Sequence, residues 1–176
     1  QSLVEKITRD KQLEESMIAE LDESEMNQAR LWVRGVLNQR IFMRDQYHLA
    51  LVKVVTALAS KGSAVFLGRG ANLILRDAAT MRLRLVAGYQ VRLTNIMERT
   101  GLTRPEARAL LEETDRRRAE YIRKVFREEP GKPGNYDLVI NTDRLDLDSQ
   151  IELVLLALLQ MGQETRSALG SQAAKG

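Results

Sequence analysis

Residues 65–75 read Val65-Phe66-Leu67-Gly68-Arg69-Gly70-Ala71-Asn72-Leu73-Ile74-Leu75. The apolar run from Ser63 to Leu67 is typical of a buried strand in a parallel sheet. The glycines that follow it allow a sharp turn and a close approach of the backbone to a ligand. A turn at the carboxyl end of such a strand lies where α/β proteins bind ligands, although a short glycine turn has a purely structural explanation as well.

Helices and strands alternate around this stretch. The spacing of apolar residues predicts helices over 3–21 (one or two), 24–44, 45–60, 89–100 and 103–127. A last helix is predicted to begin at Asp146 or Asp148 and to end near Gly162, before a flexible tail over 163–176. Strands are predicted at 81–87 and 136–141. This alternation indicates a helix-rich α/β fold with a parallel sheet.

The composition excludes several classes of protein. With 176 residues, 44% hydrophobic and 29% charged, the chain can bury a core and is not disordered. Cysteine is absent and His48 is the one histidine, which excludes disulfide modules, thiolate metal sites and His-rich clusters. No signal peptide is visible, and the apolar run over 153–159 is too short to span a bilayer. We therefore expect a cytoplasmic protein that does not enter a membrane.

Positive charge is concentrated in the middle of the chain. Residues 61–132 carry 16 basic and 9 acidic side chains, most of the basic ones arginine, whereas the whole chain has a net charge of +3. Arginine makes paired hydrogen bonds to phosphate and carboxylate groups. A confined excess of arginine favours a small anionic ligand over nucleic acid, and an RNA-binding helical domain remains the weaker alternative.

The predicted helix over 103–127 begins with a capping box formed by Thr103 and Glu106. When residues are projected at ~100° each, Asp115 and Arg118 fall in the apolar sector and are expected to pair. Arg117 falls at the edge of that sector, and the projection turns Arg116 and Arg123 away from it. The pattern has two interpretations: a structural ion pair beside solvated arginines, or a clamp for a phosphorylated ligand. Elsewhere, His48 is expected to be packed or at the rim of the core, and Trp32 and Tyr47 to be core residues.

Three stretches, residues 65–75, 113–123 and 136–145, resemble in order the strand-turn, lid helix and final strand of the cytidylate kinase-like family of P-loop nucleotide kinases. The resemblance covers about residues 45–162. It implies a P-loop NTPase-like parallel sheet flanked by helices, with N-terminal helices over 1–60 and the sheet and lid over 61–162. It also implies transfer of the γ-phosphoryl group of ATP, with Mg²⁺, to a nucleoside monophosphate such as (d)CMP.

The resemblance implies roles for individual residues. Arg69 matches the arginine of a Gly-Arg-Asp turn that helps to hold the monophosphate, and Gly70 stands where those enzymes have aspartate. Substrate binding is accordingly expected at Gly68, Arg69, Gly70, Asn72 and Arg117.

Catalytic roles are expected for Asp115 and Arg118, which match the Asp-x-x-Arg element of the lid, whereas Leu111 stands where a further lid arginine would be. Arg116 and Arg123 are expected to contact ATP.

The sequence departs from the family in one large respect. No glycine-rich phosphate loop occurs in the 176 residues, and the central first strand that would precede it is missing as well. Because the chain begins at Gln1, we expect an upstream segment, and we predict that this chain alone is inactive. The alternative is a degenerate relative that binds a nucleotide or another protein without catalysis. The base preference and the oligomeric state stay open.

Overall fold

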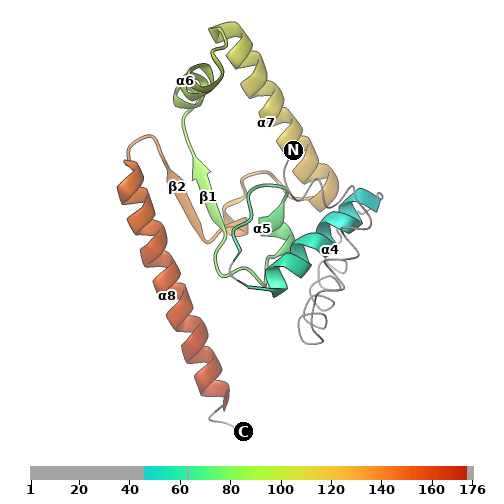
Figure 1. The fold of residues 1–176 in the computed structure, drawn as a ribbon, viewed down its shortest axis with the longest axis vertical. Helices are drawn as coiled ribbons and strands as arrows, with labels where there is room; N and C mark the ends of the chain where they lie inside the picture. Colours follow the sequence, from blue (N-terminus) through green and yellow to red (C-terminus); the bar gives the residue numbers. More distant parts are fainter. Residues whose placement is uncertain (1–45, 63, 174–176) are drawn as a thin grey trace. The chain divides into compact units, whose positions relative to one another are not determined.

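The computed structural model describes residues 46–62 and 64–173. The helices predicted over 3–21 and 24–44, with Trp32, therefore lie outside the described residues. The chain divides into two compact units, one made of residues 1–78 and 119–130 and the other of residues 79–118 and 131–176. Figure 1 shows the helices and strands coloured along the sequence, from blue to red.

The core of the first unit is built around helix α4, Gln46–Ser60. Apolar side chains on more than one side of α4 are buried, as predicted for this helix: Leu51, Val52, Val54 and Val55. Thr56 is fully buried among them, and its hydroxyl donates a hydrogen bond to the carbonyl of Val52 at 2.8 Å. Among the described residues, this unit also contains the short helix α5, Ala71–Ile74, and the last residues of helix α7, Arg104–Phe126.

The predicted strand over Ser63–Leu67 is wrong. Residues 64–67 have no regular secondary structure, and Val65 and Leu67 are 91% and 90% exposed. The physical reason is that a strand needs a hydrogen-bonded neighbour, and no described segment pairs with these residues. A short apolar run has too few residues for periodicity to decide its structure.

The second unit contains a small parallel sheet. Strand β1, Leu83–Val86, pairs with strand β2, Leu138–Asn141, in a register that sets Leu83 opposite Leu138 and Leu85 opposite Ile140. Between the two strands the chain passes through α6, Tyr89–Thr100, then α7 and the 3₁₀ turn η1, Pro133–Asn135. Both strands and a parallel sheet were predicted and are confirmed, so the fold is helix-rich α/β.

Helices α6 and α7 pack against each other within this unit. Their shared core contains Leu93, Ala107 and Leu111, which are all at most 2% exposed. The predicted capping box at the start of α7 is formed in part, because the carboxylate of Glu106 accepts hydrogen bonds from the backbone N–H and the hydroxyl of Thr103. The helices predicted over 89–100 and 103–127 are therefore confirmed.

Helix α8 extends from Leu147 to Ala173. Asp146 begins it, since its carboxylate accepts a hydrogen bond from the N–H of Ser149 at 2.8 Å. The predicted end near Gly162 is wrong, because one glycine inside a helix costs only about 1 kcal/mol relative to alanine and does not stop it. In the part of the chain that the structure describes, neither α8 nor any other helix combines the length and apolar character of a membrane span.

Candidate functional site

The turn at Gly68–Gly70 has an unusual backbone. Gly68, Arg69 and Gly70 have φ angles of 73°, 56° and 72°, so three successive residues are left-handed. The N–H of Ala71 donates to the carbonyl of Gly68 at 3.1 Å, which closes the turn. The carbonyl of Gly70 then accepts hydrogen bonds from the N–H groups of Leu73 and Ile74 in α5. Glycine suits this conformation, but Arg69 adopts it against the preference of any residue with a Cβ atom.

Gly70 is also in close contact with α7. A Cβ atom added at Gly70 would lie 2.3 Å from Cε2 of Phe126, far inside van der Waals contact. Both residues are buried. An aspartate at this position, as in the Gly-Arg-Asp turn, would therefore require the ring of Phe126 to move.

Arg69 is exposed, and its carbonyl oxygen accepts a hydrogen bond from the hydroxyl of Tyr121 at 3.2 Å. Burial raises the pKa of Tyr121 to about 12, so the phenol stays protonated and can donate. His48 stacks on Tyr121 with ring centroids 5.8 Å apart, and Tyr47 contacts His48 edge-on. His48 is thus a half-buried packed residue, as predicted. Asn72, the other residue predicted near the turn, is half-buried within α5.

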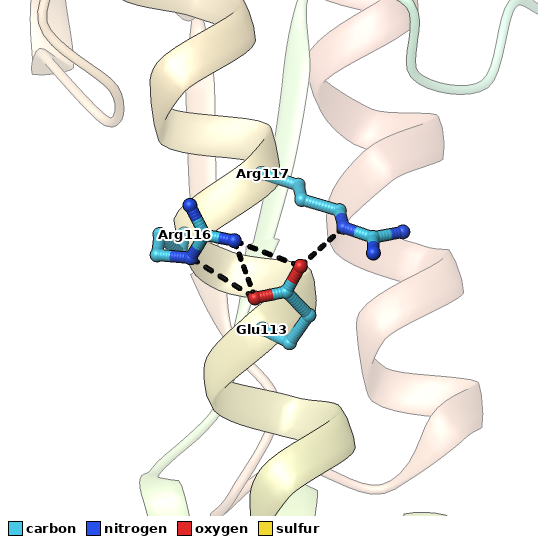
Figure 2. Close-up of polar contacts among 3 residues, drawn as sticks. All are labelled: Glu113, Arg116 and Arg117. Atoms are coloured by element: carbon cyan, nitrogen blue, oxygen red, sulfur yellow. Dashed lines mark hydrogen bonds and ion pairs between the residues drawn. The ribbon is translucent and has the colours of Figure 1, made fainter.

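Two of the predicted arginines share one carboxylate (Figure 2). Arg116 donates to Glu113 from Nε at 2.9 Å and from Nη2 at 2.7 Å, and Arg117 donates from Nε at 2.5 Å. The hydrogen bonds from Arg116, and to a lesser extent the one from Arg117, lower the pKa of the Glu113 carboxyl. The side chains of Arg116 and Arg117 are 58% and 74% exposed. The Arg117 guanidinium has five N–H donors and is bonded to Glu113 through Nε, so it retains donors for a further acceptor.

The predicted pairing of Asp115 with Arg118 is wrong. Asp115 is half-buried and accepts a hydrogen bond from Nη2 of Arg92, on α6, at 2.5 Å. Arg118 is exposed, and among the described residues no hydrogen bond or ion pair to it is found. The projection was correct in placing Asp115 on the inner side of α7 and wrong in placing Arg118 there. Helix α6, which begins at Tyr89, forms hydrogen bonds with Glu112 and Asp115 of α7. Arg118 lies about one helical turn beyond Asp115 and has no such bond with the residues described.

Arg123 lies near the carboxyl end of α7 and is exposed. Its Nη2 donates to Glu129 at 3.1 Å. Arg123 belongs to the same unit as the Gly68–Gly70 turn, whereas Arg116, Arg117 and Arg118 belong to the other unit. The structure thus brings Arg116 and Arg117 together on Glu113 and keeps Arg123 with a carboxylate of its own.

Two residues that contribute to these groups were missed at the level of sequence, Arg92 and Tyr121. A signal for Arg92 existed, because a carboxylate on the apolar side of α7 requires a cation. The predicted partner was an arginine of α7 itself, whereas the cation comes from α6. No comparable signal pointed to Tyr121, because its partner is a backbone carbonyl 52 residues away in the chain.

ATP and Mg²⁺ need a phosphate loop and a group of metal-ligating side chains. Within the described ranges, 46–62 and 64–173, no three His, Cys, Asp or Glu side chains come together as a metal site. The sequence of 176 residues contains no lysine-bearing phosphate loop for the β- and γ-phosphates of ATP. The residues that the structure describes therefore do not fit Mg²⁺, and the sequence does not supply this loop for ATP.

Comparison with known proteins bears on the family. Over 98 residues, 55% of this chain, the sequence is 32% identical to a protein named uronate isomerase from Corynebacterium glutamicum. The chain spans about a fifth of that curated relative, 19% of its length. A crystal structure of an uncharacterized protein from Eubacterium ventriosum is similar with a TM-score of 0.65 at 19% identity, over 90% of this chain and 80% of that one. That likeness shows a shared fold alone.

The sequence model of the cytidylate kinase-like family matches residues 1–144. This match includes the glycine turn, the lid helix and the final strand, the three motifs on which the resemblance was based. It also extends into residues 1–44, where the resemblance had been looser. The chain therefore belongs to the cytidylate kinase-like family.

Proposed function

We propose that this kinase-like domain binds a nucleoside monophosphate, (d)CMP, through the phosphate group, and that its arginines neutralise the phosphate charge. The observation that carries the proposal is the run of three exposed arginines at 116–118 on α7. Glu113 is the carboxylate bonded to two of them, and Arg118 extends from the helix with no partner among the described residues. Such guanidinium groups suit the oxygens of a phosphate.

Arg69 forms the second part of the proposal. It is exposed on a turn whose backbone is fixed by hydrogen bonds and by Phe126, and it matches the family's monophosphate-binding arginine. In an intact relative with a phosphate loop and a P-loop NTPase-like sheet, the reaction would be ATP + (d)CMP to ADP + (d)CDP. Phosphoryl transfer depends mainly on positioning and charge neutralisation, which exposed arginines can supply.

Calorimetric titration of the 176-residue chain tests the proposal. CMP and dCMP should bind at least about tenfold more tightly than cytidine, which lacks the phosphate. Arg118→Ala should weaken CMP binding by roughly 10–100-fold, since a hydrogen bond to a charged group contributes about 1.5–3 kcal/mol. Arg108→Ala is the matched control, because Arg108 is an exposed arginine of the same helix bonded to Glu112. Equal affinity for CMP and cytidine, or equal losses in the two variants, would contradict the proposal.

A second candidate is a module that binds a nucleotide without transferring phosphate. The observation that favours it is Gly70, which stands where the Gly-Arg-Asp turn has aspartate. The ring of Phe126 packs where the side chain of that aspartate would begin. Both candidates predict CMP binding by this chain. Steady-state kinetics of the intact protein separate them, because the second predicts binding of CMP without formation of CDP.

A further inference from the structure

Two aromatic side chains near the end of α7 hold the Gly68–Gly70 turn. The ring of Phe126 packs against Gly70, and the hydroxyl of Tyr121 donates to the carbonyl of Arg69 at 3.2 Å. The two rings contact each other edge-on, with centroids 5.8 Å apart. The turn is therefore fixed from one side by a packed ring and at its centre by a hydrogen bond.

The hydrogen bond is placed where the turn is least favourable. Arg69 has a φ of 56°, in the left-handed region that residues with a Cβ atom avoid. A left-handed conformation at a residue other than glycine persists only when its surroundings determine it. The carbonyl that accepts the hydrogen bond from the Tyr121 hydroxyl belongs to this same residue. The bond therefore restrains the peptide group next to the Cα atom from which the arginine side chain extends.

The Tyr121 hydroxyl is fixed as a donor. Its ring contacts both His48, stacked at 5.8 Å, and Phe126, edge-on at 5.8 Å, so packing restricts the direction of the hydroxyl. Burial keeps the phenol protonated by raising its pKa to about 12, while the charge of Arg69 acts in the opposite direction.

We infer that Tyr121 is a positioning residue: through the carbonyl of Arg69 it holds the left-handed turn that presents the Arg69 guanidinium to a phosphate. This inference rests on the proposed function, in which Arg69 binds the phosphate of CMP. Tyr121 itself makes no contact with the nucleotide in this account. It acts only through the backbone of Arg69.

A double-mutant cycle on CMP affinity tests the inference with Tyr121→Phe, Arg69→Ala and the double variant. Tyr121→Phe keeps the ring and removes the donor, and it should weaken CMP binding about 3–10-fold. In the Arg69→Ala background the same change should alter the affinity less than twofold, because there is no guanidinium left to position. Tyr89→Phe is the control, since its hydroxyl donates to a side chain, Glu112, on another helix. It should leave CMP affinity unchanged.

Backbone NMR of residue 69 without nucleotide gives a readout that is independent of binding. In Tyr121→Phe the coupling constants should show that the positive φ is no longer uniquely populated, while the melting temperature changes little. Support requires both results. If Arg69→Ala weakens CMP binding but Tyr121→Phe does not, or if φ stays positive in Tyr121→Phe, the positioning role is overturned and the proposed function stands. If Arg69→Ala leaves the affinity unchanged, the proposed role of Arg69 fails, and the positioning role with it.

Discussion

Arg82 and Asp137 join the amino ends of the two strands of the sheet. The carboxylate of Asp137 accepts hydrogen bonds from the backbone N–H of Arg82 at 2.7 Å and from its guanidinium Nε at 3.0 Å and Nη2 at 2.5 Å. The side chains are 17% and 22% exposed. One carboxylate thus satisfies three donors of one residue across the strand pair, which makes it a pH-dependent contributor to stability.

Asp137→Asn should lower the free energy of unfolding by about 1–2 kcal/mol at pH 7, because charge-assisted bonds are lost. The hydrogen bonds from Arg82 lower the pKa of Asp137 in the folded state. The contribution is therefore present above the unfolded-state pKa of about 3.9 and is lost as the pH falls through the folded-state pKa. Urea denaturation at several pH values should show the two proteins converging in acid. Glu98→Gln, an exposed change on α6, should show no such convergence, and a constant difference for Asp137→Asn would contradict the prediction.

Gly70→Ala should destabilise the protein by about 2–5 kcal/mol. The left-handed φ of 72° costs about 1–2 kcal/mol for alanine, and the clash with Phe126 adds an overpacking cost of about 1–3 kcal/mol. Gly68→Ala separates the two effects, since Gly68 has a φ of 73° and open space around its Cβ position. Thermal denaturation of both variants measures the difference. If both lose the same stability, Phe126 moves aside freely and the packing argument fails.

The pairing of Arg92 with Asp115 predicts an energetic coupling between α6 and α7. A double-mutant cycle with Arg92→Met and Asp115→Asn should give a coupling of about 0.5–1 kcal/mol at low salt, modest because the side chains are 32% and 44% exposed. Added salt should reduce this coupling. The same cycle between Asp115 and Arg118 should give a value near zero. A larger coupling there than with Arg92 would restore the pairing predicted from the helical projection.

The 176-residue chain should show no ATP-dependent phosphorylation of CMP or dCMP. The reason is chemical, since no glycine-rich loop with a lysine is present in this sequence to hold the β- and γ-phosphates. A coupled assay for ADP measures the rate, with an active nucleoside monophosphate kinase as the positive control. Turnover well above the no-enzyme background would refute the prediction.

Local patterns predicted the elements whose causes are local. The helix over 89–100 has the same bounds in the structure as in the prediction, and the contact between Thr103 and Glu106 marks the start of α7. The family could be identified from the sequence, because its motifs are short and occur in order along the chain. The parallel character of the sheet also followed, because a long helical connection between two strands favours it.

Features that depend on distant neighbours could not be predicted. The apolar pattern of residues 64–67 is that of a strand, but pairing depends on another segment. Asp115 was correctly expected to need a cation, yet its choice of Arg92 depends on where α6 begins relative to α7. Likewise the contact of Gly70 with Phe126 joins residues that no sequence period relates.

That last contact has an evolutionary consequence. Because the ring of Phe126 occupies the volume that a side chain at position 70 needs, the two positions cannot change independently. An aspartate at position 70 would require a smaller residue at position 126 or a displaced ring. For anyone who wishes to rebuild the Gly-Arg-Asp turn in this chain, the starting point is α7 rather than the turn.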